Sequence, residues 1–145
     1  MYAASENHAD MLYASGFLAP DPFLWFATEE ETAIAVNTME VGRARQEKRA
    51  GLNVYSYRDL SPAPEGESGA TIPKDCIAHI SEKHHIRRWY VPPDFPFALA
   101  EELQPLGLTL QSQKRFCPER ERKRTDEVDA IRTGVQLAEG AFQAA

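Results

Sequence analysis

The chain has 145 residues, the length of one ordinary domain, and a net charge of −6, with 22 acidic against 16 basic side chains. Hydrophobic residues make up 43% and charged residues 26%, a balance typical of globular proteins that excludes disordered and collagen-like chains. The acidity argues against a nucleic-acid surface, and no stretch reaches the roughly 18 apolar residues of a membrane span. The N-terminal run MYAASENHADMLYASG lacks the basic and apolar parts of a secretory signal, so we expect a cytoplasmic location.

The first half of the chain predicts a β-hairpin, a helix and a further strand. Residues 23–28 (FLWFAT) and 32–39 (TAIAVNTM) are rich in β-branched and aromatic side chains. Only three glutamates separate them, so we expect two strands joined by a tight turn. Residues 40–50 favour a helix, for which Gly51 is the expected C-terminal cap. A β-type run and a loop rich in Pro, Gly and Ser follow, at residues 53–57 and 61–70.

The second half alternates between helix and strand. Residues 72–83 carry isoleucines and a cysteine on one helical face, and residues 87–91 (RRWYV) predict a strand. Residues 96–106 predict a second helix, and residues 108–113 (LTLQSQ) alternate as a half-buried strand does. Early strands followed by alternating elements predict the α/β layered class, with a mixed sheet and helices on both faces.

The final segment, residues 125–145, predicts an amphipathic helix. Thr125 is a good N-cap residue, and two acidic residues follow in the first turn, where the helix dipole favours them. Apolar side chains then recur every three or four residues and form one stripe, made of Val128, Ile131, Val135, Ala138 and Phe142. The stripe packs either on the chain's own core or on a partner outside it.

A second unusual segment is SGFLAPDPFLWF, residues 15–26. Two prolines flank Asp21, and aromatic residues precede and follow them, which predicts a rigid loop. Its rings either form ordinary core under a turn or provide a contact surface for a partner or substrate.

No residue pattern predicts an active site. Cys76 and His79 lie one helical turn apart, with His84 and His85 nearby, but their spacing fits no structural zinc pattern. The basic stretch at residues 114–124 is interrupted by glutamates and is read as a charged linker. The two cysteines, Cys76 and Cys117, are far apart and are expected to be free thiols. We therefore expect no catalytic residue, metal site or cofactor in this chain.

The order of these segments resembles the N-terminal domain of the creatinase, prolidase and Xaa-Pro aminopeptidase family. The resemblance lies in LYASGFLAPDPFLWF, AIAVNTMEVGRAR, IRRWYVPPDFPFALAEEL and TDEVDAIRTGVQLAEGAF. In that family the first run is a strand that ends in a Thr/Ser-Gly-Phe turn and leads to a hairpin strand. The last run is similar to the family's entry helix, represented here by Lys123, Glu127, Val128, Ile131 and Arg132.

The resemblance implies a three-layer α/β/α domain over residues 1–115, ribonuclease-H-like, with a mixed sheet of about five or six strands. Residues 116–145 would be a charged linker and the start of a helix that leads to an absent C-terminal "pita-bread" domain. In the family that domain supplies two Asp, one His and two Glu, which hold two divalent metal ions (Mn, Co or Zn) that activate water.

The function implied for this chain is that of a non-catalytic domain that forms a homodimer and shapes access to the partner's active site. The loop residues proposed for that role are Phe17, Asp21, Pro22 and Phe23, and the stripe of Val128, Ile131, Val135 and Phe142 would meet the catalytic domain. Two alternatives stay open: a stand-alone interaction module of the same fold, and an independent hydrolase that uses His84 or His85 with a metal.

Overall fold

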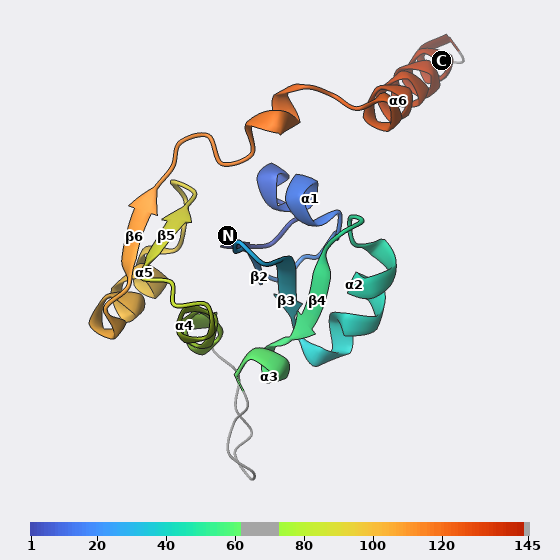
Figure 1. Cartoon of the computed structure of the whole chain (residues 1–145). Helices are drawn as coiled ribbons and strands as arrows, with labels where there is room; N and C mark the ends of the chain where they lie inside the picture. The colour runs from blue at the N-terminus through green and yellow to red at the C-terminus, as the bar shows by residue number, and fades with distance from the viewer. Residues whose placement is uncertain (62–72, 144–145) are drawn as a thin grey trace.

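The computed structural model describes residues 1–61 and 73–143, which form an α/β fold with two sheets (Figure 1). The larger sheet has the order β1-β2-β3-β4, with antiparallel pairing from β1 to β3 and parallel pairing between β3 and β4. The smaller sheet pairs β5 with β6 in parallel. The strands are β1 (Tyr2–Ala3), β2 (Phe23–Ala27), β3 (Thr32–Val36), β4 (Asn53–Ser56), β5 (Arg88–Val91) and β6 (Thr109–Ser112).

Besides these strands, the described residues form six α-helices and three short 3-10 helices. The α-helices are α1 (Ala9–Ser15), α2 (Val41–Glu47), α3 (Tyr57–Leu60), α4 (Pro73–Lys83), α5 (Phe97–Leu103) and α6 (Thr125–Gln143). The 3-10 helices are η1 (Thr38–Glu40), η2 (Gln104–Leu106) and η3 (Pro118–Glu121). Over residues 1–61 and 73–143, none of the helices combines the length and the apolar character that crossing a membrane requires.

The predicted hairpin is confirmed as β2 and β3, which pair from Leu24 opposite Ala35 to Ala27 opposite Thr32. Thr28 holds the turn between them. Its hydroxyl accepts hydrogen bonds from the N–H groups of Glu30 (3.2 Å) and Glu31 (3.1 Å), and its own N–H donates to the Glu31 carbonyl at 2.8 Å. The later elements also lie where they were predicted, apart from small differences at their ends. The predicted loop at residues 61–70 lies outside the described residues except for Ser61.

The expectation of a strand before the Gly16 turn is wrong, because the structure has helix α1 there. The His8 side chain caps its start by accepting a hydrogen bond from the Met11 N–H at 3.0 Å. Gly16 ends it in the left-handed conformation and donates to the Leu12 carbonyl at 2.8 Å. The buried face of the helix is made by Met11 and Ser15, one turn apart.

Two predicted helix ends also differ. Helix α2 stops at Glu47, because Lys48 turns to an extended conformation (φ −53°, ψ 149°), and Gly51 lies in the following turn instead of capping the helix. At α6, the Val128 N–H donates to the Arg124 carbonyl, so the cap position is Arg124 and Thr125 is the first helical residue.

The predicted single sheet of about five or six strands is corrected to a four-stranded sheet and a separate two-stranded sheet. Strand β1 is one edge of the larger sheet. It pairs only with β2, Tyr2 opposite Leu24 and Ala3 opposite Phe23. In the described chain β5 pairs with β6 and with no strand of the larger sheet. The N-terminus lies between the two sheets (Figure 1).

The larger sheet carries a hydrophobic cluster on each face, as predicted, because successive side chains of a strand point to opposite sides. Leu24 and Phe26 belong to a cluster with residues of α3, α4 and α5, whereas Phe23 belongs to a second cluster with residues of α1 and α2. In β3, Ala33 and Ala35 face the first cluster, while Ile34 and Val36 face the second. Helices therefore cover both faces of the four-stranded sheet.

Replacing Gly16 by alanine is expected to destabilise the fold by more than backbone conformation alone explains. At φ +68°, an L side chain is strained by about 1–2 kcal/mol, and an added Cβ would lie 2.8 Å from the Arg49 backbone nitrogen. Forcing that backbone apart is expected to cost about 1–3 kcal/mol more. The matched control is Gly107→Ala, where φ is +74° but nothing lies within 4 Å of the added Cβ. Urea unfolding of both variants measures the difference, and equal losses would contradict the close contact.

Candidate functional site

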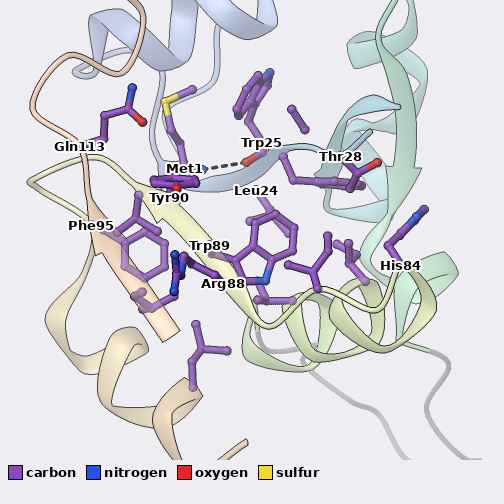
Figure 2. A pocket seen from close by; sticks show the side chains of 18 of the residues that line it. Met1, Leu24, Trp25, Thr28, His84, Arg88, Trp89, Tyr90, Phe95 and Gln113 are labelled. Carbon is purple, nitrogen blue, oxygen red and sulfur yellow. Dashed lines mark hydrogen bonds between the residues drawn. The ribbon is translucent and has the colours of Figure 1, made fainter. Parts of the chain in front are cut away.

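A cavity of about 680 Å³ lies between the facing edges of the two sheets; we call it the inter-sheet cavity (Figure 2). In Figure 2, Met1 and Trp25 of the larger sheet appear with Arg88, Trp89 and Tyr90 of β5. The walls are mostly apolar and include members of both hydrophobic clusters: Leu24, Phe26, Ile77 and Ile80 from the first, and Met1 and Trp25 from the second. The cavity therefore spans the thickness of the sheet layer.

Both edges of the inter-sheet cavity expose backbone hydrogen-bonding groups. Trp25 of β2 faces β1, because its N–H donates to the Met1 carbonyl at 2.9 Å and its carbonyl accepts from the Met1 amine at 2.7 Å. Backbone groups alternate in direction along a strand, so Ala27 points its N–H and C=O to the same side, beyond the end of β1. In β5, the Arg87 and Val91 carbonyls accept from β6, so the intervening Arg88 and Tyr90 point their backbone groups away from β6.

The amino group of Met1 is fully buried at this position. Burial lowers its pKa from 8.0 to about 5, an effect partly offset by the neighbouring Cys117 and Asp94. At neutral pH the folded chain therefore holds this amine mainly uncharged.

An acidic cluster at the hairpin turn joins three elements beside the cavity. Glu31 accepts hydrogen bonds from Asn53 and from the Tyr55 hydroxyl, both at 2.7 Å. His84, just after α4, lies between two carboxylates, 3.3 Å from Glu30 through Nδ1 and 3.8 Å from Glu31 through Nε2. The cluster ties the hairpin to β4 and to the end of α4.

The contacts in this cluster shift the pKa of Glu31 and that of Tyr55. Burial opposes ionisation of Glu31, but the hydrogen bonds from Tyr55 and Asn53, with the charges of Lys83 and His84, lower its pKa overall. The hydrogen bond to Glu31, followed by burial, raises the pKa of Tyr55. Glu31 is therefore held ionised as a hydrogen-bond acceptor, which is a structural role. The sequence had placed it only in the tight turn between two strands.

The histidines and cysteines considered for a metal site are not brought together. Over residues 1–61 and 73–143, no group of three or more His, Cys, Asp or Glu side chains is placed to hold a metal ion. Both cysteines are free, as predicted. Burial raises the pKa of Cys76 to about 12 and that of Cys117 to about 11, so both remain protonated thiols at neutral pH.

The loop at residues 17–23 has a buried interior and an exposed tip. Phe17 and Phe23 are buried and contact each other edge to face, with ring centroids 5.4 Å apart. These two rings are therefore part of the core, which is one of the two interpretations that the sequence left open. Asp21 and Pro22 are exposed, and the neighbouring Leu18 is 52% exposed.

Two polar side chains fix the backbone of this loop. The Ser5 hydroxyl donates to the Phe17 carbonyl at 2.6 Å and accepts from the Ala19 N–H at 2.7 Å. The Arg43 guanidinium lies 4.4 Å from the centre of the Phe17 ring and donates to the Leu18 carbonyl at 2.8 Å. Whether the exposed tip meets a partner or substrate stays a prediction.

Helix α6 extends away from both sheets, and none of its described residues is buried (Figure 1). Val128 is half-buried, whereas Ile131 is 53%, Val135 51% and Phe142 86% exposed. The segment before the helix does contact the body of the domain. Phe116 packs edge to face on Trp25 at 6.0 Å, and Arg120 donates to Asp10 at 2.6 Å. Among the described residues, nothing covers the apolar stripe. The predicted division at residues 115 and 116 stays a prediction.

The fold is similar to that of solved Xaa-Pro aminopeptidase structures. An X-Pro aminopeptidase from Thermotoga maritima matches 99% of this chain with a TM-score of 0.76 and 15% identity, and the match covers 38% of the Thermotoga chain. A Streptococcus thermophilus Xaa-Pro aminopeptidase structure matches 83% of each chain (TM-score 0.62, 17% identity). One from Streptococcus pyogenes matches 77% of this chain and 76% of its own (TM-score 0.59, 16% identity).

No protein-family model and no curated protein sequence matches this chain. The structural likeness therefore identifies a fold: the chain has the α/β fold of the N-terminal region of Xaa-Pro aminopeptidases. It spans 38% of the length of the Thermotoga chain that it matches.

Proposed function

We propose that the chain is the non-catalytic N-terminal domain of a prolidase- or Xaa-Pro aminopeptidase-like metallopeptidase. The observation that carries this proposal is the match to the Thermotoga structure, which takes in 99% of this chain but 38% of that one. A domain that aligns along nearly its whole length with part of a longer enzyme is expected to work beside a further domain.

Helix α6 supports the same proposal. A run of exposed apolar side chains on one helical face is costly in water and marks an interaction surface. Ile131, Val135 and Phe142 would pack on the following "pita-bread" domain, which would hold two divalent ions (Mn, Co or Zn). The described residues of this chain do not fit such a metal site, so no catalytic step is assigned to them.

The remaining parts of the proposal are dimerisation and the shaping of substrate access, in a cytoplasmic homodimer. The exposed Asp21 and Pro22, held in place by the buried Phe17 and Phe23, would face the partner's active site. The finer form of the fold that we propose is a ribonuclease-H-like α/β/α domain.

The sharpest test is the reading frame beyond the codon for Ala145. A continuous frame that encodes two Asp, one His and two Glu in the order of the metallopeptidase site would support the proposal. A stop codon directly after Ala145 would contradict it and favour the stand-alone interaction module. Incubation of the isolated chain with Xaa-Pro peptides and Mn²⁺ or Co²⁺ is expected to give no cleavage, and turnover would contradict a non-catalytic role.

The isolated chain is expected to associate through the α6 stripe when its natural partner surface is missing. In sedimentation velocity, Ile131→Glu with Val135→Glu should abolish association by placing charges on the stripe. The matched control, Thr133→Glu with Gln136→Glu, adds the same charge away from the stripe and should associate as the unaltered chain does. A strictly monomeric unaltered chain would contradict the role given to this helix.

A further inference from the structure

Residues 116–124, which we call the strap, lead from the two sheets and their helices, the body of the domain, to helix α6 (Figure 1). The strap contacts the body on α1 and β2. Phe116 packs on Trp25 of β2, and Arg120 donates to Asp10 of α1 at 2.6 Å. In the described chain, the backbone hydrogen bonds of the strap run within it or to the start of α6. Side chains of the strap therefore hold it on the body.

Tyr13, near the end of α1, contacts the point where the strap becomes α6. The guanidinium carbon of Arg124 lies 5.3 Å from the centre of the Tyr13 ring, and that of Arg49 lies 5.0 Å from the same centre. Arg124 is also the cap residue of α6, and its N–H donates to the Glu127 carboxylate at 2.8 Å. One residue therefore both begins the helix and contacts the body.

Beyond its first turn, the described part of α6 lacks contacts of this kind. Its side chains are exposed except for Glu127 and Val128, which are half-buried. Its side-chain hydrogen bonds and ion pairs, over the described residues, stay within residues 124–143. The helix has 19 residues and a length of about 28 Å, so a small rotation at Arg124 displaces its far end widely.

The contacts that hold the strap are individually weak. An exposed cation–π contact changes an equilibrium by about two- to fivefold, and an ion pair as accessible as that of Arg120 with Asp10 changes it by a similar factor at most. A cavity of about 370 Å³ is lined by both the strap and the body, including Phe116, Glu119, Trp25 and Leu52. Packing under the strap is therefore incomplete, and a few side-chain contacts decide its position.

We propose that the strap is a releasable hinge, whose arginine contacts with Asp10 and Tyr13 hold α6 in one direction relative to the body. When these contacts break, α6 turns as a unit while the body keeps its structure. The direction of the helix is thus set by α1. This proposal does not depend on which surface the apolar stripe of α6 meets.

The test measures the direction of α6 through residual dipolar couplings of the backbone amides. All proteins carry Ile131→Glu with Val135→Glu, so that the chain stays monomeric. The test variant adds Arg120→Gln with Arg124→Gln, which removes both arginine contacts. Cα chemical shifts show whether α6 stays helical.

A matched control removes the same charge elsewhere, by Arg122→Gln with Arg132→Gln. The Arg122 side chain is exposed, and Arg132 pairs with Asp129 inside α6. A second pair of variants isolates the Tyr13 ring. Tyr13→Phe keeps an aromatic face for Arg124, whereas Tyr13→Leu does not.

With the unaltered strap, the couplings of residues 128–140 are expected to fit the same alignment tensor as those of the larger sheet. The test variant should reduce them by at least about twofold, because a helix that reorients averages its couplings. Tyr13→Leu should act in the same direction, and the matched control and Tyr13→Phe should leave the couplings unchanged.

Three results would overturn the proposal. The first is equal couplings in the test variant and the matched control. The second is a helix that already fails to fit the tensor of the sheet with the unaltered strap. The third is a loss of helical Cα shifts together with the couplings, because α6 would then unfold instead of turning.

Discussion

Between pH 5 and pH 8, the free energy of unfolding is expected to rise by about 3 kcal/mol more in the protein with a free amino terminus than in its Nα-acetylated form. The cause is the buried Met1 amine, whose pKa falls from 8.0 to about 5 on folding. Within this window the unfolded chain binds the proton and the folded chain does not, so stability rises with pH. Below pH 5 the cost of burial is fully present, and above pH 8 it is absent.

The measurement is urea unfolding at pH 5 and pH 8 for the free and the acetylated protein. All side chains are the same in both proteins, so their effects cancel in the difference. The acetylated protein should be the more stable of the two at pH 5, because it has no amine to desolvate. Parallel profiles would show that the Met1 amine is solvated in the folded protein.

Replacing Phe17 by alanine is expected to lower the free energy of unfolding by about 3–5 kcal/mol, the usual cost of removing a buried aromatic side chain. Phe17 is fully buried and contacts both the Phe23 ring and the Arg43 guanidinium. Its loss leaves a cavity beneath the loop and removes the surface on which Arg43 rests.

The control for this substitution is Leu18→Ala, one residue further along the same loop. Leu18 is 52% exposed, so its truncation should change stability by no more than about 0.5 kcal/mol. Urea unfolding of both variants gives the comparison. A small loss at Phe17 would mean that the ring is not part of the core and would revive its interpretation as a contact residue.

The elements that local patterns predicted well are those whose signals lie within a few residues. The hairpin of β2 and β3 was predicted because two apolar runs flank three glutamates, and Thr28 closes that turn through bonds to its immediate neighbours. Helix α6 was predicted because its stripe repeats at helical spacing over its whole length. The sequence left open whether the stripe packs on the chain's own core or on a partner outside it. In the described residues the stripe does not pack on the core.

Helix α1 was missed because its signals are weak in sequence. Its cap is a histidine, which is not among the preferred N-cap residues, and the helix is only seven residues long. The His8 ring that accepts the hydrogen bond from the Met11 N–H also contacts Asp94, from a distant part of the chain, with its Nε2 3.0 Å from the carboxylate. Tertiary contacts of this kind cannot be read from a local pattern.

The candidate site was the least predictable part of the molecule. The division into two sheets depends on pairing between strands that are distant in sequence, and side-chain periodicity says nothing of which edges meet. From the sequence, Glu31 was placed only in the tight turn of three glutamates, because its partners Asn53 and Tyr55 lie on another strand. The inter-sheet cavity had no sequence signal, since it is defined by a gap between elements.

The hydrogen bonds of Ser5 have a consequence for any molecule that meets the tip of the loop. One hydroxyl bridges two backbone groups of the loop, at Phe17 and Ala19, so the path to Asp21 and Pro22 is set before any encounter. A rigid surface loses little conformational entropy on association, and more of the contact energy is then retained as affinity. A rigid tip also accommodates fewer molecular shapes. It would therefore select binding molecules whose surface already matches its own, because the loop does not change conformation to meet them.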